Sequence, residues 1–156
     1  MGMKSIADLI RSHSFFKNME EEYLELISGC GENETFRAGE FVFREGGTAD
    51  KFYIIRHGGV ALELHMPGKD PLIIQTRRDD DVMGWSWFIP PYRWEWDARC
   101  LQVTRVVSFE AQCLRDKMEN DCQFAYGLMK RFLPIIHDRM SAARLQLVDM
   151  YGTDRK

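Results

Sequence analysis

Short strand-like runs, broken at regular intervals by turn residues, fill the middle of the chain and limit the folds open to it. Between residues 33 and 109 these runs cover residues 41–44, 52–56, 60–65, 72–76 and 97–109. In the run that begins at Val60, Leu62 and Leu64 fall on the same face of an extended segment and give it one apolar side. Strands this short, with turns this regular, predict a closed antiparallel sandwich or roll.

Helical periodicity flanks the strand region on both sides. The N-terminal part holds two short helical patterns, for which Ser5 and Asn18 are the expected N-caps. The C-terminal part predicts a short helix from Ala111 and a long helix from near Asp121. Because 156 residues suit one core, we predict a single α+β domain. Its expected parts are N-terminal helices at residues 1–32, an antiparallel, jelly-roll-like β-roll at 33–109 and C-terminal helices at 110–150.

The predicted long helix carries an apolar stripe with heptad spacing. Its members recur at steps of three and four and are Phe132, Ile136, Met140, Ala143 and Leu147. Such a stripe fits packing against the chain's own roll or pairing with a second copy, and heptad steps favour pairing. We therefore expect a homodimer with these five residues in the interface.

Composition and motif content argue against several function classes. The net charge of −3 shows no excess of positive charge of the kind that nucleic-acid-binding domains carry. No window approaches the roughly 18 apolar residues of a membrane span, and the N-terminus lacks the apolar core of a signal peptide. The sequence contains no catalytic GxSxG motif, no P-loop and no HExxH motif, so we expect no enzyme activity.

The cysteines and histidines show no ligand spacing. None of the four cysteines forms a CxxC pair, and no histidine lies near a cysteine at metal-ligand spacing. We therefore expect no metal site and no haem. Reduced thiols and a cytoplasmic location, without a membrane partner, are the simplest expectation.

The segment from Phe36 to Val60 carries a recognisable pattern, FRAGEFVFREGGTADKFYIIRHGGV. Gly46 and Gly58 fall at sharp reversals between its strands, where glycine adopts a positive φ at little cost. With the flanking helices, this pattern resembles the cyclic-nucleotide-binding domain family, in its Crp/Fnr-like branch. The resemblance covers nearly the whole chain. It implies a regulatory effector domain whose long C-terminal helix usually pairs with its twin.

In that family a phosphate-binding cassette holds the ligand. There a Gly-Glu pair opens a short helix, and an arginine before an Ala-Thr or Ala-Ser pair binds the cyclic phosphate. Here Gly84 matches the family glycine, but Trp85 stands where glutamate is expected. When Ala98 is aligned with the family alanine, Trp96 stands at the arginine position and Arg99 at the position of threonine or serine. The resemblance therefore implies a degenerate cassette with a Gly-Trp-Ser-Trp start, for which cyclic AMP and cyclic GMP are disfavoured ligands.

All four tryptophans lie between Gly84 and Asp97. They predict either an aromatic-walled pocket for a flat or apolar ligand, or a set of indoles that fills the former nucleotide pocket as core. The candidate ligand-binding residues are Gly84, Trp85, Ser86, Trp87, Trp96 and Arg99. No residue stands out as catalytic or metal-binding.

The predicted function is a non-enzymatic, regulatory, ligand-sensing domain that signals through its C-terminal helix. Two alternatives stay open. One is a genuine cyclic AMP- or cyclic GMP-binding domain that uses Arg99 as a non-standard arginine. The other is a structural interaction module with a self-filled pocket. Only residues 151–156 follow the long helix, so we expect no DNA-binding domain, no direct DNA contact and a signal passed to a separate protein partner. The residues do not identify the small-molecule ligand.

Overall fold

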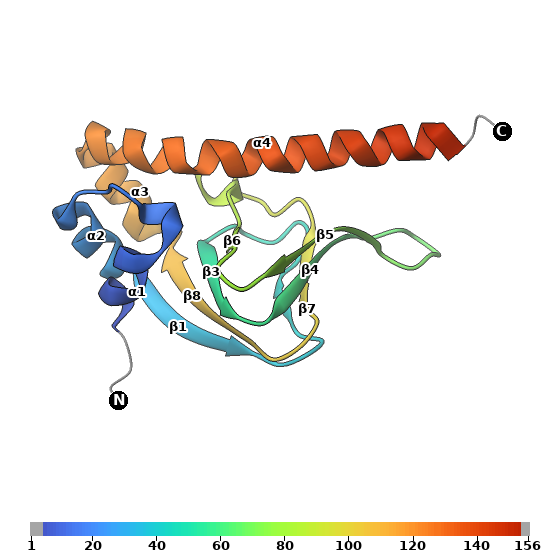
Figure 1. Cartoon of the computed structure of the whole chain (residues 1–156), viewed down its shortest axis with the longest axis horizontal. Helices are drawn as coiled ribbons and strands as arrows, with labels where there is room; N and C mark the ends of the chain where they lie inside the picture. Colours follow the sequence, from blue (N-terminus) through green and yellow to red (C-terminus); the bar gives the residue numbers. More distant parts are fainter. Residues whose placement is uncertain (1–4, 154–156) are drawn as a thin grey trace.

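Two antiparallel sheets of four strands each form a roll, with helices at one end and along one side (Figure 1). The structure is a computed structural model and describes residues 5–153. The first sheet has the order β1 (Gly31–Phe36), β8 (Thr104–Glu110), β3 (Lys51–His57) and β6 (Val82–Met83). The second has the order β2 (Phe41–Phe43), β7 (Asp97–Cys100), β4 (Gly59–Leu64) and β5 (Leu72–Arg78). The predicted antiparallel β-roll is confirmed.

Strand β4 is buried more completely than its alternation predicts. Val60 and Ala61 are fully buried, and Leu62 and Glu63 are each 3% exposed. This strand lies between β7 and β5, so both of its edges are paired. Alternation along the strand still divides its residues, since Val60 and Leu62 belong to the apolar core cluster whereas Glu63 pairs with an arginine.

The N-terminal part folds into α1 (Ile6–Ser12), the short 3-10 helix η1 (Ser14–Phe16) and α2 (Glu21–Ser28). Ser5 caps α1 as predicted, because its side chain accepts a hydrogen bond from Asp8 N. The cap predicted at Asn18 is wrong. The N-cap of α2 is Glu20, and Asn18 instead adopts a φ of 67°, a turn conformation that asparagine tolerates better than most residues.

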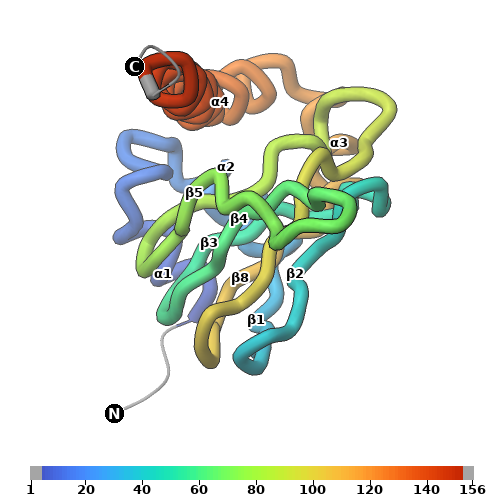
Figure 2. Tube along the Cα trace, turned by 90° about the vertical axis from the view of Figure 1, so that its right-hand side faces the viewer, coloured from blue at the N-terminus to red at the C-terminus, as the bar shows by residue number. Residues whose placement is uncertain are grey.

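The C-terminal part consists of α3 (Ala111–Asn120) and the 32-residue α4 (Cys122–Thr153), close to the predicted bounds. Figure 1 shows α4 running across the top of the roll, and Figure 2 shows it end-on above the strands. Its roll-facing stripe starts with three side chains that are at most 1% exposed: Phe124, Leu128 and Phe132. This stripe fixes α4 against the aromatic core, where Phe132 packs edge-on to Phe52 at 5.2 Å between ring centres.

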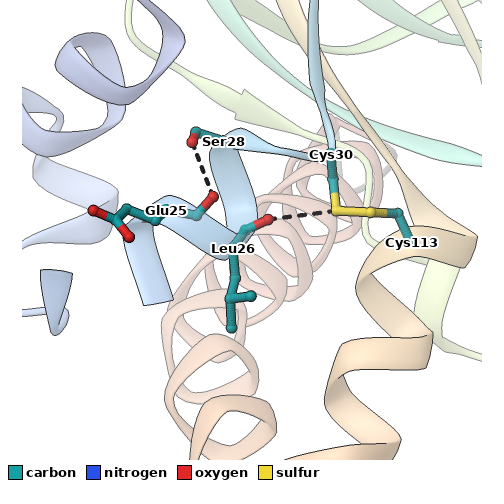
Figure 3. The surroundings of a disulfide bond; sticks show 5 residues. All are labelled: Glu25, Leu26, Ser28, Cys30 and Cys113. Carbon is teal, nitrogen blue, oxygen red and sulfur yellow. Dashed lines mark hydrogen bonds between the residues drawn. A yellow bond between two sulfur atoms is a disulfide. The ribbon is translucent and has the colours of Figure 1, made fainter. Parts of the chain in front are cut away.

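A disulfide bond joins Cys30, two residues after the end of α2, to Cys113 in α3 (Figure 3). This finding corrects the expectation of four reduced thiols. The two cysteines are 83 positions apart in sequence, but their Cα atoms lie 5.8 Å apart, within the range a disulfide needs. Cys100 and Cys122 are free, the first buried and the second exposed.

Candidate functional site

The segment after β6 begins with a glycine that no other residue type can easily replace. Gly84 has a φ of +95°, and a Cβ at this position would lie 2.9 Å from Cη2 of Trp94. The backbone turn and the indole therefore both require glycine here. The chain then forms the short 3-10 helix η2 (Ser86–Phe88), with Ser86 buried.

All four indoles belong to the buried apolar core cluster, and two of them pack directly against phenylalanine rings. Trp87 is fully buried and packs against Phe52 and Phe132, with ring centres 5.6 and 5.7 Å away. Its Nε1 is buried and has no hydrogen-bond partner within residues 5–153. Trp94 is stacked on Phe43 at 3.8 Å between ring centres. Both side chains therefore have a packing role.

The other two indoles lie together under α4. Trp85 and Trp96 meet edge-to-face at 5.1 Å between ring centres and keep 8% and 9% of their surface exposed. Arg139 of α4 places its guanidinium carbon 5.7 Å from the centre of the Trp96 ring. The cassette segment and the long helix therefore meet at a cation and an aromatic face.

Arg139 is a functional candidate that the sequence did not indicate. The residue is 6% exposed, and none of its Nε, Nη1 and Nη2 atoms has a hydrogen-bond partner within the described chain. Burial, with a second contribution from the positive charge of Arg77, lowers the pKa of Arg139 to about 10, so the group stays charged at neutral pH. Its position on the roll-facing stripe, seven residues after Phe132, is the signal that could have identified it.

Arg77 of β5 is the second cation near this point. Burial lowers its pKa, although the carboxylates of Asp81 and Asp138 act in the opposite direction. Its Nη2 donates a hydrogen bond of 2.7 Å to Gln75 Oε1. We use the name Trp96–Arg139 site for the group formed by Trp85, Trp96, Arg139 and Arg77.

Arg99 is not brought together with these indoles. Its Nε donates to Glu63 Oε1 at 2.5 Å, and the Glu63 side chain is 4% exposed. In the register of β7 and β4, Arg99 lies opposite Ala61, whereas its neighbour Ala98 lies opposite the core residue Leu62. Alternation therefore directs Arg99 away from the core side of its sheet and toward a buried carboxylate.

Arginine side chains also hold the cassette segment in place from outside. Arg115 of α3 donates to the backbone oxygen of Trp87 and lies over the Tyr92 ring at 4.4 Å. Arg93 donates to Gly46 O and Thr48 Oγ1, at 3.3 and 3.2 Å. These contacts give Arg93 and Arg115 a structural role in the loop.

The expected interface residues of α4 separate into two faces. Phe132 is 1% exposed and lies in the core of its own roll, so its assignment to an exposed seam is corrected. Met140 and Leu147 are 66% and 54% exposed, Ala143 is exposed and Ile136 is half-buried. The exposed neighbour of Phe132 is Leu133, at 62%, which continues the seven-residue step from Met140.

Cavities and charged clusters elsewhere are separate from this segment. Cavities of about 630 and 600 Å³ lie between η1 and α4 and between α1 and β3, and neither is lined by a tryptophan. Within residues 5–153, no group of three or more histidine, cysteine, aspartate or glutamate side chains is arranged to hold a metal ion. None of the helices in that range combines the length and apolar character needed to cross a membrane.

Comparison with known proteins gives one family. The sequence model of the cyclic nucleotide-binding domain matches residues 33–121. The cGMP-dependent protein kinase 2 of Homo sapiens is 32% identical over 78 residues, which cover 49% of this chain and 10% of the kinase. The chain thus spans about a tenth of the length of the curated relatives it matches.

Solved structures show the same fold. A cyclic nucleotide-binding protein of Geobacter metallireducens superposes with a TM-score of 0.77 at 26% identity, covering 88% of this chain and 99% of that one. The regulatory domain of Toxoplasma gondii PKA, crystallised with cAMP, superposes with a TM-score of 0.65 at 18% identity, covering 72% of this chain and 44% of that one.

Proposed function

Because the chain belongs to the cyclic nucleotide-binding domain family, we propose that it is a single regulatory, ligand-sensing domain with a degenerate phosphate cassette. Its role is binding without catalysis. The ligand differs from cyclic AMP and cyclic GMP, and its binding is transmitted through α4. The sites proposed for the ligand are those around Gly84, Trp85, Ser86, Trp87 and Trp96.

The observation that carries this proposal is the state of the cassette side chains. Trp85 and Trp96 stand at the positions where the family pattern has glutamate and arginine, and both are nearly buried. Arg99, the arginine that could replace the missing family arginine, is paired with Glu63. A cyclic phosphate keeps its charge at neutral pH, so its burial needs a matched cation and several donors. At the two positions where the family has glutamate and arginine, the cassette has indole N–H groups, which carry no charge.

Contacts between the cassette and α4 support transmission through the helix. Trp96 lies under Arg139, and Trp87 and Phe88 both pack against Phe132, at 5.7 and 5.3 Å. A ligand that moves these rings also moves the helix that rests on them. We propose that the exposed face of α4, which carries Met140 and Leu147, passes this movement to a second copy of the chain in a homodimer and onward to a partner protein.

The experiment is a titration with cyclic AMP and cyclic GMP, followed by calorimetry and by tryptophan fluorescence. We expect affinities about 10²–10⁴-fold weaker than a low-micromolar family site, because two charged contacts are missing at roughly 1.5–3 kcal/mol each. Low-micromolar binding of either nucleotide that is lost in Arg99→Ala would restore the usual family function. The control is Arg105→Ala, which removes an exposed arginine of β8.

A second candidate function is supported by the packing of the indoles. All four are at most 9% exposed, as a structural interaction module with a self-filled pocket requires. Native mass spectrometry of the purified protein and hydrogen exchange of α4 distinguish the two. A co-purified small molecule whose removal changes exchange in α4 supports sensing, whereas no bound molecule and constant exchange support the interaction module.

A further inference from the structure

Among the side chains of α4 that are less than a tenth exposed, one is charged, and it lies near the middle of the helix. Phe124, Leu128 and Phe132 occupy the first turns of the helix and are at most 1% exposed. Arg139 follows Phe132 by seven residues, about two helical turns, and is 6% exposed. A guanidinium is seldom buried unless it is paired, because removal of its hydration is costly.

Among residues 5–153, no group compensates this charge by hydrogen bonding. All three nitrogen atoms of the Arg139 guanidinium are buried without a partner, and the ion pairs within residues 5–153 include neither Arg139 nor Arg77. The Trp96 ring at 5.7 Å attracts the cation but accepts none of its N–H groups. The five donors of Arg139 are therefore available in one buried fork.

A second cation, Arg77, lies near this guanidinium and increases the cost of burying its positive charge. Arg77 lies on β5 close enough to disfavour the charged form of Arg139 and is itself partly buried, while the carboxylates of Asp81 and Asp138 offset part of the charge of Arg77. The two guanidinium groups come from different elements, and a hydrogen bond of 3.1 Å from Gln146 Nε2 to Ile74 O joins the same helix to the same strand. An oxyanion between the two cations would remove their repulsion and supply the missing acceptors.

We propose that Arg139 and Arg77 bind the anionic group of the ligand, and that the ligand is a small aromatic acid whose ring packs on Trp96. The anion is a carboxylate or a phosphate monoester, since both match the planar fork of arginine. Trp85 and Trp96 supply the apolar wall for the ring. This assignment rests on the proposed sensing function and moves the charge recognition from the cassette to α4. The anion then ties α4 to β5 directly.

Simple probes test both parts of the ligand. Benzoate and phenyl phosphate carry the ring and each kind of anion, benzamide carries the ring without charge, and inorganic phosphate carries charge without a ring. By calorimetry we expect benzoate or phenyl phosphate to bind about 10- to 100-fold more tightly than benzamide, the gain typical of a charged hydrogen bond. The better of the two identifies the anion. Inorganic phosphate binds more weakly than phenyl phosphate.

Variants locate the binding. Arg139→Met keeps the aliphatic stem and is expected to reduce the affinity for the better anion at least 10-fold, while Arg139→Lys, which keeps the charge but lacks the fork, reduces it less. Arg144→Met, at an exposed arginine of the same helix, leaves it unchanged. Without ligand, Arg139→Met should melt several degrees higher than the unmodified protein, because it removes an unpaired buried cation.

Several outcomes would overturn the site: no binding of either aromatic anion, benzamide binding as tightly as the anions, equal affinities in Arg139→Met, or a lower melting temperature of that variant. Hydrogen exchange of α4 separates this inference from the sensing function. Arg139-dependent binding with unchanged exchange keeps the anion site and contradicts signalling through α4. Changed exchange on binding that Arg139→Met does not weaken keeps the sensing function and contradicts the site.

Discussion

At Gly84 a single residue carries two independent structural requirements. Its φ of +95° is a conformation in which a Cβ is strained, and the space where the Cβ would lie is taken by the Trp94 ring. The resemblance to the family pattern indicates this glycine as part of a ligand cassette. Its surroundings show in addition that it allows an indole to pack against the backbone.

Gly84→Ala is expected to lower the free energy of unfolding by about 3 kcal/mol, from roughly 1–2 kcal/mol of backbone strain and a similar cost of overpacking. The matched control is Gly46→Ala. Gly46 has a φ of +83° with nothing within 4 Å of the added Cβ, so it should lose only the backbone part. Urea denaturation of both variants measures the difference. Equal losses would show that Trp94 yields to the added methyl group.

The pair formed by Arg99 and Glu63 makes a second prediction at this scale. Arg99→Ala leaves the carboxylate of Glu63 buried without its cation, and we expect a loss of about 3 kcal/mol in the free energy of unfolding. Adding Glu63→Gln should recover part of that loss, since the remaining buried group is neutral. Urea denaturation of the single and double variants tests this coupling. A loss under about 1 kcal/mol would place the pair with ordinary exposed salt bridges.

At the scale of the element, α4 presents two stripes that the sequence alone does not separate. The apolar steps predict a heptad seam, but they assign Phe132 to it, whereas Phe132 packs in the core and Leu133 is exposed. Both residues fit helical spacing from Ile136, one at four residues and the other at three. Which of them faces outward depends on how the helix rotates on the roll, a tertiary property. The same rotation places Arg139 inside, which is why the sequence did not indicate it.

The exposed stripe predicts the behaviour of α4 in solution. Met140→Glu combined with Leu147→Glu should convert the proposed dimer to a monomer at micromolar concentration, because two charges would be desolvated at the seam. Both positions are exposed in the single chain, so its fold and circular dichroism should stay the same. Light scattering gives the mass. Leu145→Glu is the control, since Leu145 is 64% exposed but lies on another side of the helix. A monomeric unmodified protein would contradict the dimer.

For the whole molecule, the order of short strands and turns was sufficient to predict the roll, because strand alternation and glycine turns act locally. The sequence alone does not predict the contacts that depend on the finished fold. Cys30 and Cys113 are 83 positions apart, with most of the roll between them, and no spacing rule connects them. The pairing of Arg99 with Glu63 is similar, because it depends on the register between β7 and β4.

The disulfide ties the two ends of the roll together, since Cys30 precedes β1 and Cys113 follows β8. A cross-link that closes a loop of this length stabilises a protein by about 2–4 kcal/mol, mainly by restricting the unfolded chain. Cys113→Ser, or reduction with dithiothreitol, should therefore lower the urea midpoint of protein purified without reductant, and dithiothreitol should have no further effect on that variant. Cys122→Ser, at an exposed free cysteine, should leave the midpoint unchanged.

Alkylation of the denatured, unreduced protein should label Cys100 and Cys122, since Cys30 and Cys113 are bonded to each other. Labelling of Cys30 and Cys113 as well would show that the thiols are reduced, in which case Cys30 is free to donate to Leu26 O, 3.6 Å from its sulfur (Figure 3).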